Sequence, residues 1–141
     1  MKDFCTTTRA GPKNFQEAQD NKSIVHRFYE EVWNEGNLDL VDELIAPSFV
    51  NHGMGSERGD DREAFKQTIQ QVRIGLNFRH TVEELIAEGD TVVARLSGQG
   101  EIEKEGPDTG ADREMFSGIG VVIWKLHGGR MTERWAFWEH A

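Results

Sequence analysis

The last segment of the chain holds the acidic side chains best suited to proton transfer. Residues 130–139 alternate in the manner of a β-strand, so every second side chain lies on the same face. One face carries Met131, Glu133, Trp135, Phe137 and Glu139, and the other carries Thr132, Arg134, Ala136, Trp138 and His140. Two carboxylates thus flank two aromatic rings. If this surface lines a pocket, the apolar wall disfavours the charged carboxylate and makes it a stronger base toward an acidic carbon, such as that of a 1,3-dicarbonyl.

Both carboxylates also have purely structural explanations. Glu139 stands close to the end of the sequence, where exposure and fraying are common, so it could be a solvated strand end. Glu133 could instead form a buried hydrogen bond to a helical layer.

A second candidate group, Asn51-His52, closes an extended segment that follows the second expected helix. His52 could donate a proton or polarise a carbonyl, and Asn51 could orient a substrate oxygen, because both side chains donate and accept hydrogen bonds. Alternatively, Asn51 shapes the turn into the following glycine-rich loop while His52 makes one structural hydrogen bond.

The sequence lacks the motifs of common cofactor sites and nucleophiles. It contains no Gly-x-Gly-x-x-Gly, no Walker-type loop, no Gly-x-Ser-x-Gly and no His-Glu-x-x-His. The single Cys5 permits no internal disulfide. Metal-ligand spacing is missing from the remaining histidines, which are His26, His80, His127 and His140. We therefore expect no cofactor and no bound metal.

Composition and charge narrow the possible partners and location. The chain of 141 residues is 37% hydrophobic and 29% charged, as is typical of one globular domain. Its net charge of −9 argues against a nucleic-acid partner, because 16 basic residues are scattered among 25 acidic ones. No apolar run approaches the roughly 18 residues of a membrane span, and the first residues lack the apolar core of a signal peptide. We expect a cytoplasmic protein that binds neither membranes nor nucleic acid.

Apolar residues recur at helical spacing in three stretches of the first half, which are expected to form helices. Capping residues and helix breakers set their bounds: Asn21 to Gly36, Asn37 to Pro47, and a stretch opening at Asp60, with Glu63 completing a capping box. Residues 1–20 precede this pattern and are expected to form a flexible arm on a single domain at 21–141.

Beyond Gly75 the pattern changes to a two-residue alternation rich in β-branched side chains. Four strands are expected, at 78–88, 91–103, 114–126 and 130–139, with glycine-containing turns between them. Helices followed by antiparallel hairpins predict an α+β domain, in which three N-terminal helices pack on a strongly curved, mainly antiparallel sheet. A ligand pocket would lie in the concave space between these layers.

Several segments together carry a family resemblance. They are FYEEVWN at 28–34, GNLDLVDEL at 36–44, FVNH at 49–52, VEELIAEGDTVVAR at 82–95, FSGI at 116–119 and GRMTERW at 129–135. In these segments the chain resembles the SnoaL-like polyketide cyclase family, which belongs to the NTF2-like superfamily. The resemblance implies a cone-shaped α+β roll, a cofactor-free apolar pocket at its wide end, and a homodimer formed through the sheet face.

The resemblance also implies a reaction type. Members of the family include cyclases that close polyketide rings by intramolecular aldol chemistry, and relatives that isomerise or hydrate secondary metabolites. In the cyclases an acidic residue on the last strand abstracts a proton, and Glu139 occupies the matching position. Where many members carry a histidine on the second long strand, residues 95–102 offer only Gln99, which can donate a hydrogen bond to an oxyanion but cannot relay a proton.

The remaining candidates are substrate contacts. Trp135 is the aromatic residue that we expect at the substrate, with Phe137 beside it. Tyr29, Trp124 and Phe116 are further candidates, although aromatics at such spacings more often fill a core. Arg113 could fork onto a substrate carboxylate or carbonyl, or simply face water.

Two functions of different kinds follow. The first is a cofactor-independent cyclase, isomerase or lyase for a polyketide-like or other polyoxygenated metabolite, with Glu139 as base and His52 as acid. The second is a non-catalytic module for small-molecule binding or dimerisation. An epoxide-hydrolase-like activity is disfavoured because Arg95 has no aspartate in its strand, although Asp112-Arg113 keeps it open; a dehydratase site with two tyrosines is excluded. A carboxylate and His52 converging on one point of a closed cavity would favour the enzyme.

Overall fold

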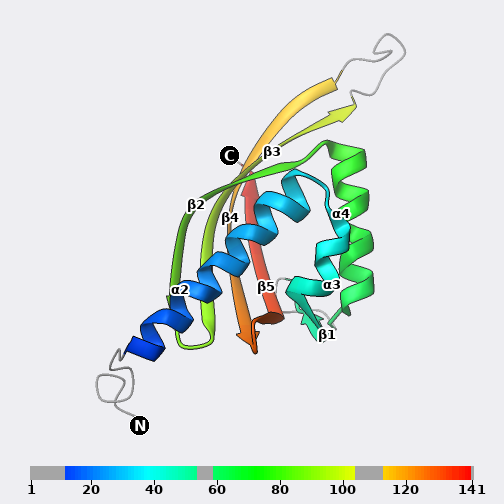
Figure 1. Cartoon of the computed structure of the whole chain (residues 1–141). Helices are drawn as coiled ribbons and strands as arrows, with labels where there is room; N and C mark the ends of the chain where they lie inside the picture. The colour runs from blue at the N-terminus through cyan, green and yellow to red at the C-terminus, as the bar shows by residue number, and fades with distance from the viewer. Residues whose placement is uncertain (1–11, 54–58, 104–112, 141) are drawn as a thin grey trace.

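The computed structural model describes residues 12–53, 59–103 and 113–140. Its helices cover one face of a curved, five-stranded sheet (Figure 1). The strands lie in the order β1-β5-β4-β3-β2, with β1 parallel to β5 and all other neighbours antiparallel. This arrangement confirms the expected α+β roll with a mainly antiparallel sheet.

The first helix begins earlier than predicted. Helix α2 (Pro12–Arg27) runs directly into the π-helical turns of η1 (Phe28–Asn34). A proline is tolerated in a first helical turn, where backbone N–H groups have no helical partner. Asn21, the predicted cap, is buried within the helix, and its side chain donates to the carbonyl of Gly89 at 3.3 Å. Residues 12–20 of the predicted arm are therefore helical, whereas residues 1–11, with Cys5, lie outside the described residues.

The second helix is shorter than predicted. A 3₁₀ turn, η2 (Leu38–Leu40), and one α-helical turn, α3 (Val41–Leu44), lead straight into strand β1 (Ile45–Asn51). Pro47 therefore lies inside a strand. The fold accepts it there because β1 is at the edge of the sheet and its pairing with β5 is irregular between Ile45 and Val50.

The third helix, α4 (Arg62–Leu76), lies close to its predicted position. Its N-cap is Asp61, whose carboxylate accepts a hydrogen bond from the backbone N–H of Ala64 at 2.9 Å. Asp60, the predicted cap, instead forms an isolated β-bridge with Asn51. The helix ends at Asn77, which has a φ of 47°, in the left-handed region where Asn is among the tolerated residues.

The four remaining strands match their predicted bounds to within one residue at each end. They are β2 (Arg79–Glu88), β3 (Thr91–Glu103), β4 (Arg113–His127) and β5 (Arg130–His140). The two turns that the structure describes contain Gly89, Gly128 and Gly129, all with positive φ. Such turns favour glycine, as predicted.

A bulge in β5 decides which side chains face the helices. Leu126 of β4 pairs with Met131, but the preceding Lys125 pairs with Glu133, so one extra residue is inserted in β5. Met131 is fully buried against the helices and does not share the face of Glu133, contrary to the prediction. We call the helix-covered side of the sheet the inner face and the opposite side the outer face. From Glu133 onward β5 alternates: Arg134, Ala136, Trp138 and His140 lie on the inner face, and Glu133, Trp135, Phe137 and Glu139 on the outer face.

Candidate functional site

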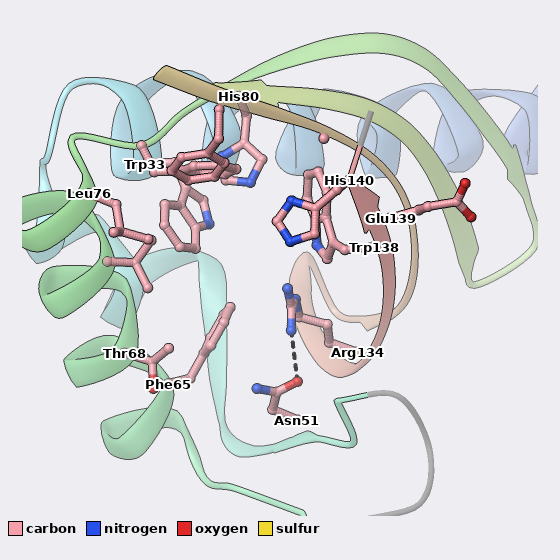
Figure 2. Close-up of a pocket in the computed structure, with 14 residues that line it drawn as sticks. Trp33, Asn51, Phe65, Thr68, Leu76, His80, Arg134, Trp138, Glu139 and His140 are labelled. Atoms are coloured by element: carbon pink, nitrogen blue, oxygen red, sulfur yellow. Dashed lines mark hydrogen bonds between the residues drawn. The ribbon is translucent and has the colours of Figure 1, made fainter. Parts of the chain in front are cut away.

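A cavity of about 340 Å³ opens between α4 and the inner face of the sheet (Figure 2). Most of its wall is apolar and is formed by Trp33, Phe65, Leu76, Phe78, Phe116 and Trp138. Sites for small molecules span roughly 300–1,000 Å³, with a few polar groups placed on apolar walls. The cavity therefore suits a compact ligand.

Arg134 brings a positive charge to this cavity. Its Nη1 donates to the side-chain oxygen of Asn51 at 2.9 Å, and its guanidinium carbon lies 4.8 Å from the centre of the Phe65 ring. The Nε atom is shielded from solvent and has no hydrogen-bond partner among the described residues. Among the described residues no carboxylate lies within ion-pair distance of the guanidinium. Burial lowers the pKa of Arg134, and the nearby Tyr29 phenol opposes that shift.

His80 provides a buried imidazole on the same cavity. Only 7% of the residue is exposed, and its ring centre lies 4.6 Å from that of Trp33 and 4.9 Å from that of Phe78. Its Nδ1 atom is buried, and no group in the described part of the chain forms a hydrogen bond with it. Burial, and secondarily the charge of Arg134, lowers the pKa of His80 from 6.5 to about 3. The ring is therefore neutral at physiological pH, and one of its nitrogens carries a proton.

The backbone of His80 is held by Asn34, at the end of the π-helix. The Asn34 side chain accepts from the backbone N–H of His80 and donates to its carbonyl, each at 2.8 Å. Because β2 is an edge strand, these two backbone groups have no strand on that side to pair with. Arg73 of α4 in turn donates to the backbone carbonyl of Trp33. The π-helix, the edge strand and α4 are thus joined at the wall of the cavity.

His140 and Trp138 complete the wall on the last strand. Both lie on the inner face, across from Gly118 and Gly120 of β4. A Cβ atom on Gly120 would meet the Trp138 indole at 2.6 Å, so only glycine lets this ring lie flat on the sheet. His140 is exposed, and its ring centre lies 6.3 Å from that of Phe116. Figure 2 shows its imidazole beside the same space that His80 and Arg134 reach.

Glu139 is oriented differently from the prediction. It lies on the outer face, where it pairs with Ile119, and it is exposed. It also contributes to the cavity edge, where it is the one acidic residue among the described lining residues. Its carboxylate, however, points away from His80 and Arg134 (Figure 2). From Glu133 onward the alternation was predicted correctly, but the face that turns inward is the one carrying Arg134.

Three predicted residues meet on the outer side of β5, away from the cavity wall. The Nε2 atom of His52 lies 2.9 Å from a carboxylate oxygen of Glu133, and the His52 ring stacks on Trp135 with 4.5 Å between ring centres. Asn51, the neighbour of His52, points the other way and lines the cavity. His52 and a carboxylate therefore do come together, but not at a point inside this cavity.

The other predicted contacts divide into three groups. Phe116 lines the cavity as a substrate contact would. Tyr29 and Trp124 are buried beneath it in the core, where the indole N–H donates to the phenol oxygen at 3.2 Å; burial raises the pKa of Tyr29 to about 12. Away from the cavity lie Gln99 and Phe137, exposed on the outer face, and Arg113, which binds Glu101 and the carbonyl of Gly75. Asp112, beside Arg113, lies outside the described residues.

Sequence reasoning missed the polar groups that the cavity presents: His80, Arg134 and His140. Alternation did place Arg134, Trp138 and His140 on one face, and that face also carries the small Ala136. The pairs of glycines at 98 and 100 and at 118 and 120 were a further signal, because they mark where rings lie against the sheet. No comparable signal singled out His80 among the scattered histidines.

The part of the chain that the structure describes has neither a candidate metal site nor a membrane-spanning helix. No group of three or more His, Cys, Asp or Glu side chains there is arranged to hold a metal ion. No helix there is long and apolar enough to cross a membrane.

Comparisons with known proteins agree with this architecture. No curated protein matches the chain. Among solved structures, IdmH from Streptomyces antibioticus, a proposed polyketide cyclase, is 23% identical with a TM-score of 0.74, over 84% of this chain and 91% of that one. A proposed SnoaL-like polyketide cyclase from Jannaschia sp. CCS1 is also 23% identical, with a TM-score of 0.74 over 92% and 90% of the two chains. At such identities the similarity establishes a common fold.

The family assignment rests on the sequence itself. The family model of the SnoaL-like polyketide cyclase matches residues 23–141. This span begins within α2 and includes β5, so it contains every residue that lines the cavity. The chain therefore belongs to the SnoaL-like polyketide cyclase family.

Proposed function

We propose that the chain is a cofactor-independent cyclase or isomerase that removes a proton from a carbon beside a ketone. Its substrate is a compact, mostly apolar, oxygenated molecule of the polyketide type. The cavity volume and its aromatic wall support this substrate class. Two imidazoles on one apolar cavity, His80 and His140, support the proton chemistry.

The two imidazoles have different roles because their surroundings differ. His80 is neutral and shielded, so it suits a hydrogen-bond donor that polarises the ketone oxygen, as neutral imidazoles do elsewhere. His140 is exposed at the cavity edge, and the unprotonated nitrogen of a neutral imidazole can accept a proton. We therefore assign His80 as the oxygen-binding group and His140 as the base.

The proposed first step converts the bound ketone into an enolate. A ring nitrogen of His140 takes the proton of the α-carbon, the C–H electron pair forms a C=C bond, and the carbonyl pair moves onto the oxygen. The N–H of His80 holds this oxygen, and the positive charge of Arg134 favours its negative charge. In a cyclisation the enolate carbon attacks a second carbonyl carbon of the same molecule, whose oxygen then takes the proton from His140. In an isomerisation the proton returns to a different carbon.

One observation carries this proposal: the buried, unpartnered nitrogen of His80 on the wall of an apolar cavity. Buried polar atoms in native proteins nearly always have a partner, so an orphaned one at a cavity calls for an external partner. A carbonyl oxygen or hydroxyl of a bound substrate would supply it.

Hydrogen–deuterium exchange tests the proposal without knowledge of the natural substrate. The probe is 1-tetralone in D₂O, with deuterium at the α-carbon followed by mass spectrometry. Wild-type protein should accelerate the exchange, and His140→Gln should slow the catalysed rate by roughly 10²-fold or more. His127→Gln, an exposed histidine at the end of β4, should exchange at the wild-type rate.

The same assay separates this assignment from the carboxylate route implied by the family resemblance. Glu139→Gln should leave the catalysed exchange unchanged, because its carboxylate points away from the cavity. Loss of exchange in Glu139→Gln, with full exchange in His140→Gln, would replace the imidazole base by the carboxylate.

We further propose that two copies of the chain pair through the outer face of the sheet. This face exposes large apolar side chains on β2, β4 and β5: Ile86, Ile119, Val121 and Phe137, each 40% to 58% exposed. Contiguous exposed apolar surface on a sheet is typical of a protein–protein contact. The cavity opens on the opposite side of the sheet, so pairing would leave it accessible.

A further inference from the structure

The guanidinium of Arg134 carries a charge but has no counter-ion among the described residues. The chain has 25 acidic residues against 16 basic ones. Other arginines of the described residues, such as Arg27, Arg62, Arg95 and Arg113, each lie within 3.5 Å of a carboxylate oxygen. The Nε atom of Arg134 is shielded from solvent, yet none of the described carboxylates reaches this side chain.

The groups that do surround Arg134 are neutral. They are the amide oxygen of Asn51, the ring faces of Phe65 and Trp124, and the phenol of Tyr29, which holds its proton because burial raises its pKa. Aromatic faces and neutral oxygens solvate a cation only in part. A buried cation without an opposite charge is costly, so such sites are normally completed by an anion.

An anion can reach Arg134 through the cavity. Arg134, Asn51 and His140 all line it, and Figure 2 shows the guanidinium between the Asn51 amide and the His140 ring, facing the open space. Glu139, the one acidic residue among the described residues that line the cavity, points elsewhere. The apolar wall would exclude water and so strengthen the attraction to an anion.

We infer that the cavity is a receptor for a carboxylate: its ligand is a compact aromatic or polycyclic acid whose carboxylate pairs with Arg134. A guanidinium binds a carboxylate through two parallel N–H donors, a match that no neutral carbonyl offers. This inference rests on the proposed function, whose substrate class it narrows from oxygenated ketones to keto acids. With the carboxylate on Arg134, the ketone oxygen of the same molecule is left to His80.

The test compares a charged probe with a neutral one of the same shape. The probes are 1-naphthoate and 1-naphthamide at pH 7, and binding is followed by calorimetry and by the fluorescence of Trp33 and Trp138, which line the cavity. Wild-type protein should bind naphthoate at least 10-fold more tightly than naphthamide. In Arg134→Gln the two probes should bind with equal affinity. Arg130→Gln, an exposed arginine on the same strand, should keep the wild-type preference.

Each outcome decides the inference. Equal affinities in the wild type, no binding of naphthoate, or a preference that survives in Arg134→Gln would overturn it. If Arg134→Gln does not fold by circular dichroism, Arg134→Met serves instead, because a similar apolar side chain often replaces a buried charge without loss of stability. If neither folds, naphthoate must shift the Nε–H resonance of a buried arginine in labelled wild-type protein, and an unshifted resonance contradicts the inference.

These results are independent of the exchange assay. Tetralone exchange without a preference for naphthoate would overturn the inference that the cavity binds a carboxylate. The proposed function would then still stand. A preference for naphthoate without tetralone exchange would overturn the proposed catalysis. The inference that the cavity binds a carboxylate would then still stand.

Discussion

The imidazole of His80 makes the stability of the folded chain depend on pH. Its pKa is about 3 in the folded chain and 6.5 as the ordinary value, and burial is the larger cause of the difference. Below pH 6.5 the unfolded chain takes up a proton at this residue that the folded chain does not. His80 therefore contributes stability that is present above pH 6.5 and is lost progressively as the pH falls toward 3.

This coupling predicts the pH dependence of a variant. Between pH 6 and pH 4 the free energy of unfolding of the wild type should fall about 1.4 kcal/mol per pH unit more steeply than that of His80→Phe, which cannot titrate. Urea denaturation at intervals of one pH unit measures both slopes. His127→Gln, exposed in the fold, should follow the wild type. Parallel curves for the wild type and His80→Phe would show that His80 titrates alike in both states.

At the scale of elements, the junction between η1 and β2 positions the site. The π-helical turns widen the end of the first helix, so that Tyr29 and Trp33 face inward while Asn34 reaches the backbone of His80. π-helical turns are rare and are found frequently at functional sites. Here the π-helical distortion lets the Asn34 side chain form the backbone hydrogen bonds that a neighbouring strand would otherwise make with β2.

Removing that side chain should therefore weaken both the fold and the site. Asn34→Ala loses two hydrogen bonds at a half-buried position and should cost about 1–3 kcal/mol in urea denaturation. Asn34→Asp keeps the acceptor for the His80 N–H but loses the donor to its carbonyl, so tetralone exchange should fall in both variants. Asn37→Ala, exposed in the next turn, should change stability by less than about 0.5 kcal/mol. A stable Asn34→Ala with full exchange would contradict the positioning role.

At the scale of the whole molecule, the layers leave the sheet with two unlike faces. Helices bury the inner face, where Trp124, Phe28 and Phe65 form the centre of the core. The outer face has no helical cover in the described part of the chain (Figure 1). This face exposes both apolar side chains and charged pairs such as Arg95–Glu84. Such a mixture suits an interface between two folded copies.

The proposed pairing predicts a change of mass with one substitution. Wild-type protein at about 100 μM should sediment at twice the mass of the 16.0 kDa chain. Ile119→Lys places a charge on the outer face and should sediment as a monomer with its naphthoate binding intact. Ile74→Lys, at an even more exposed apolar residue on α4, should remain a dimer. A monomeric wild type at this concentration would contradict the pairing.

Local pattern predicted most of the elements, and the errors have local causes. The strand at 91–103 has the predicted bounds. Its alternating β-branched residues begin directly after the turn that contains Gly89. The errors lie at Pro12, Pro47 and Asp60, each a residue with more than one permitted role. Proline can start a helix or occupy an irregular edge strand, and either of two adjacent aspartates can cap a helix. The residue types alone therefore do not decide between these roles.

The sequence by itself determined the division of the last strand into two faces from Glu133 onward, since alternation with a period of two is a property of any extended backbone. It also determined the family, through residues spread over most of the chain. Only the tertiary structure decided that Arg134 and not Glu139 turns toward the cavity, because both faces of a strand are equivalent until helices cover one of them. It also brought Arg134 and His80, on strands at opposite parts of the sheet, to one apolar space. Their chemistry depends on that burial, which no spacing along the chain encodes.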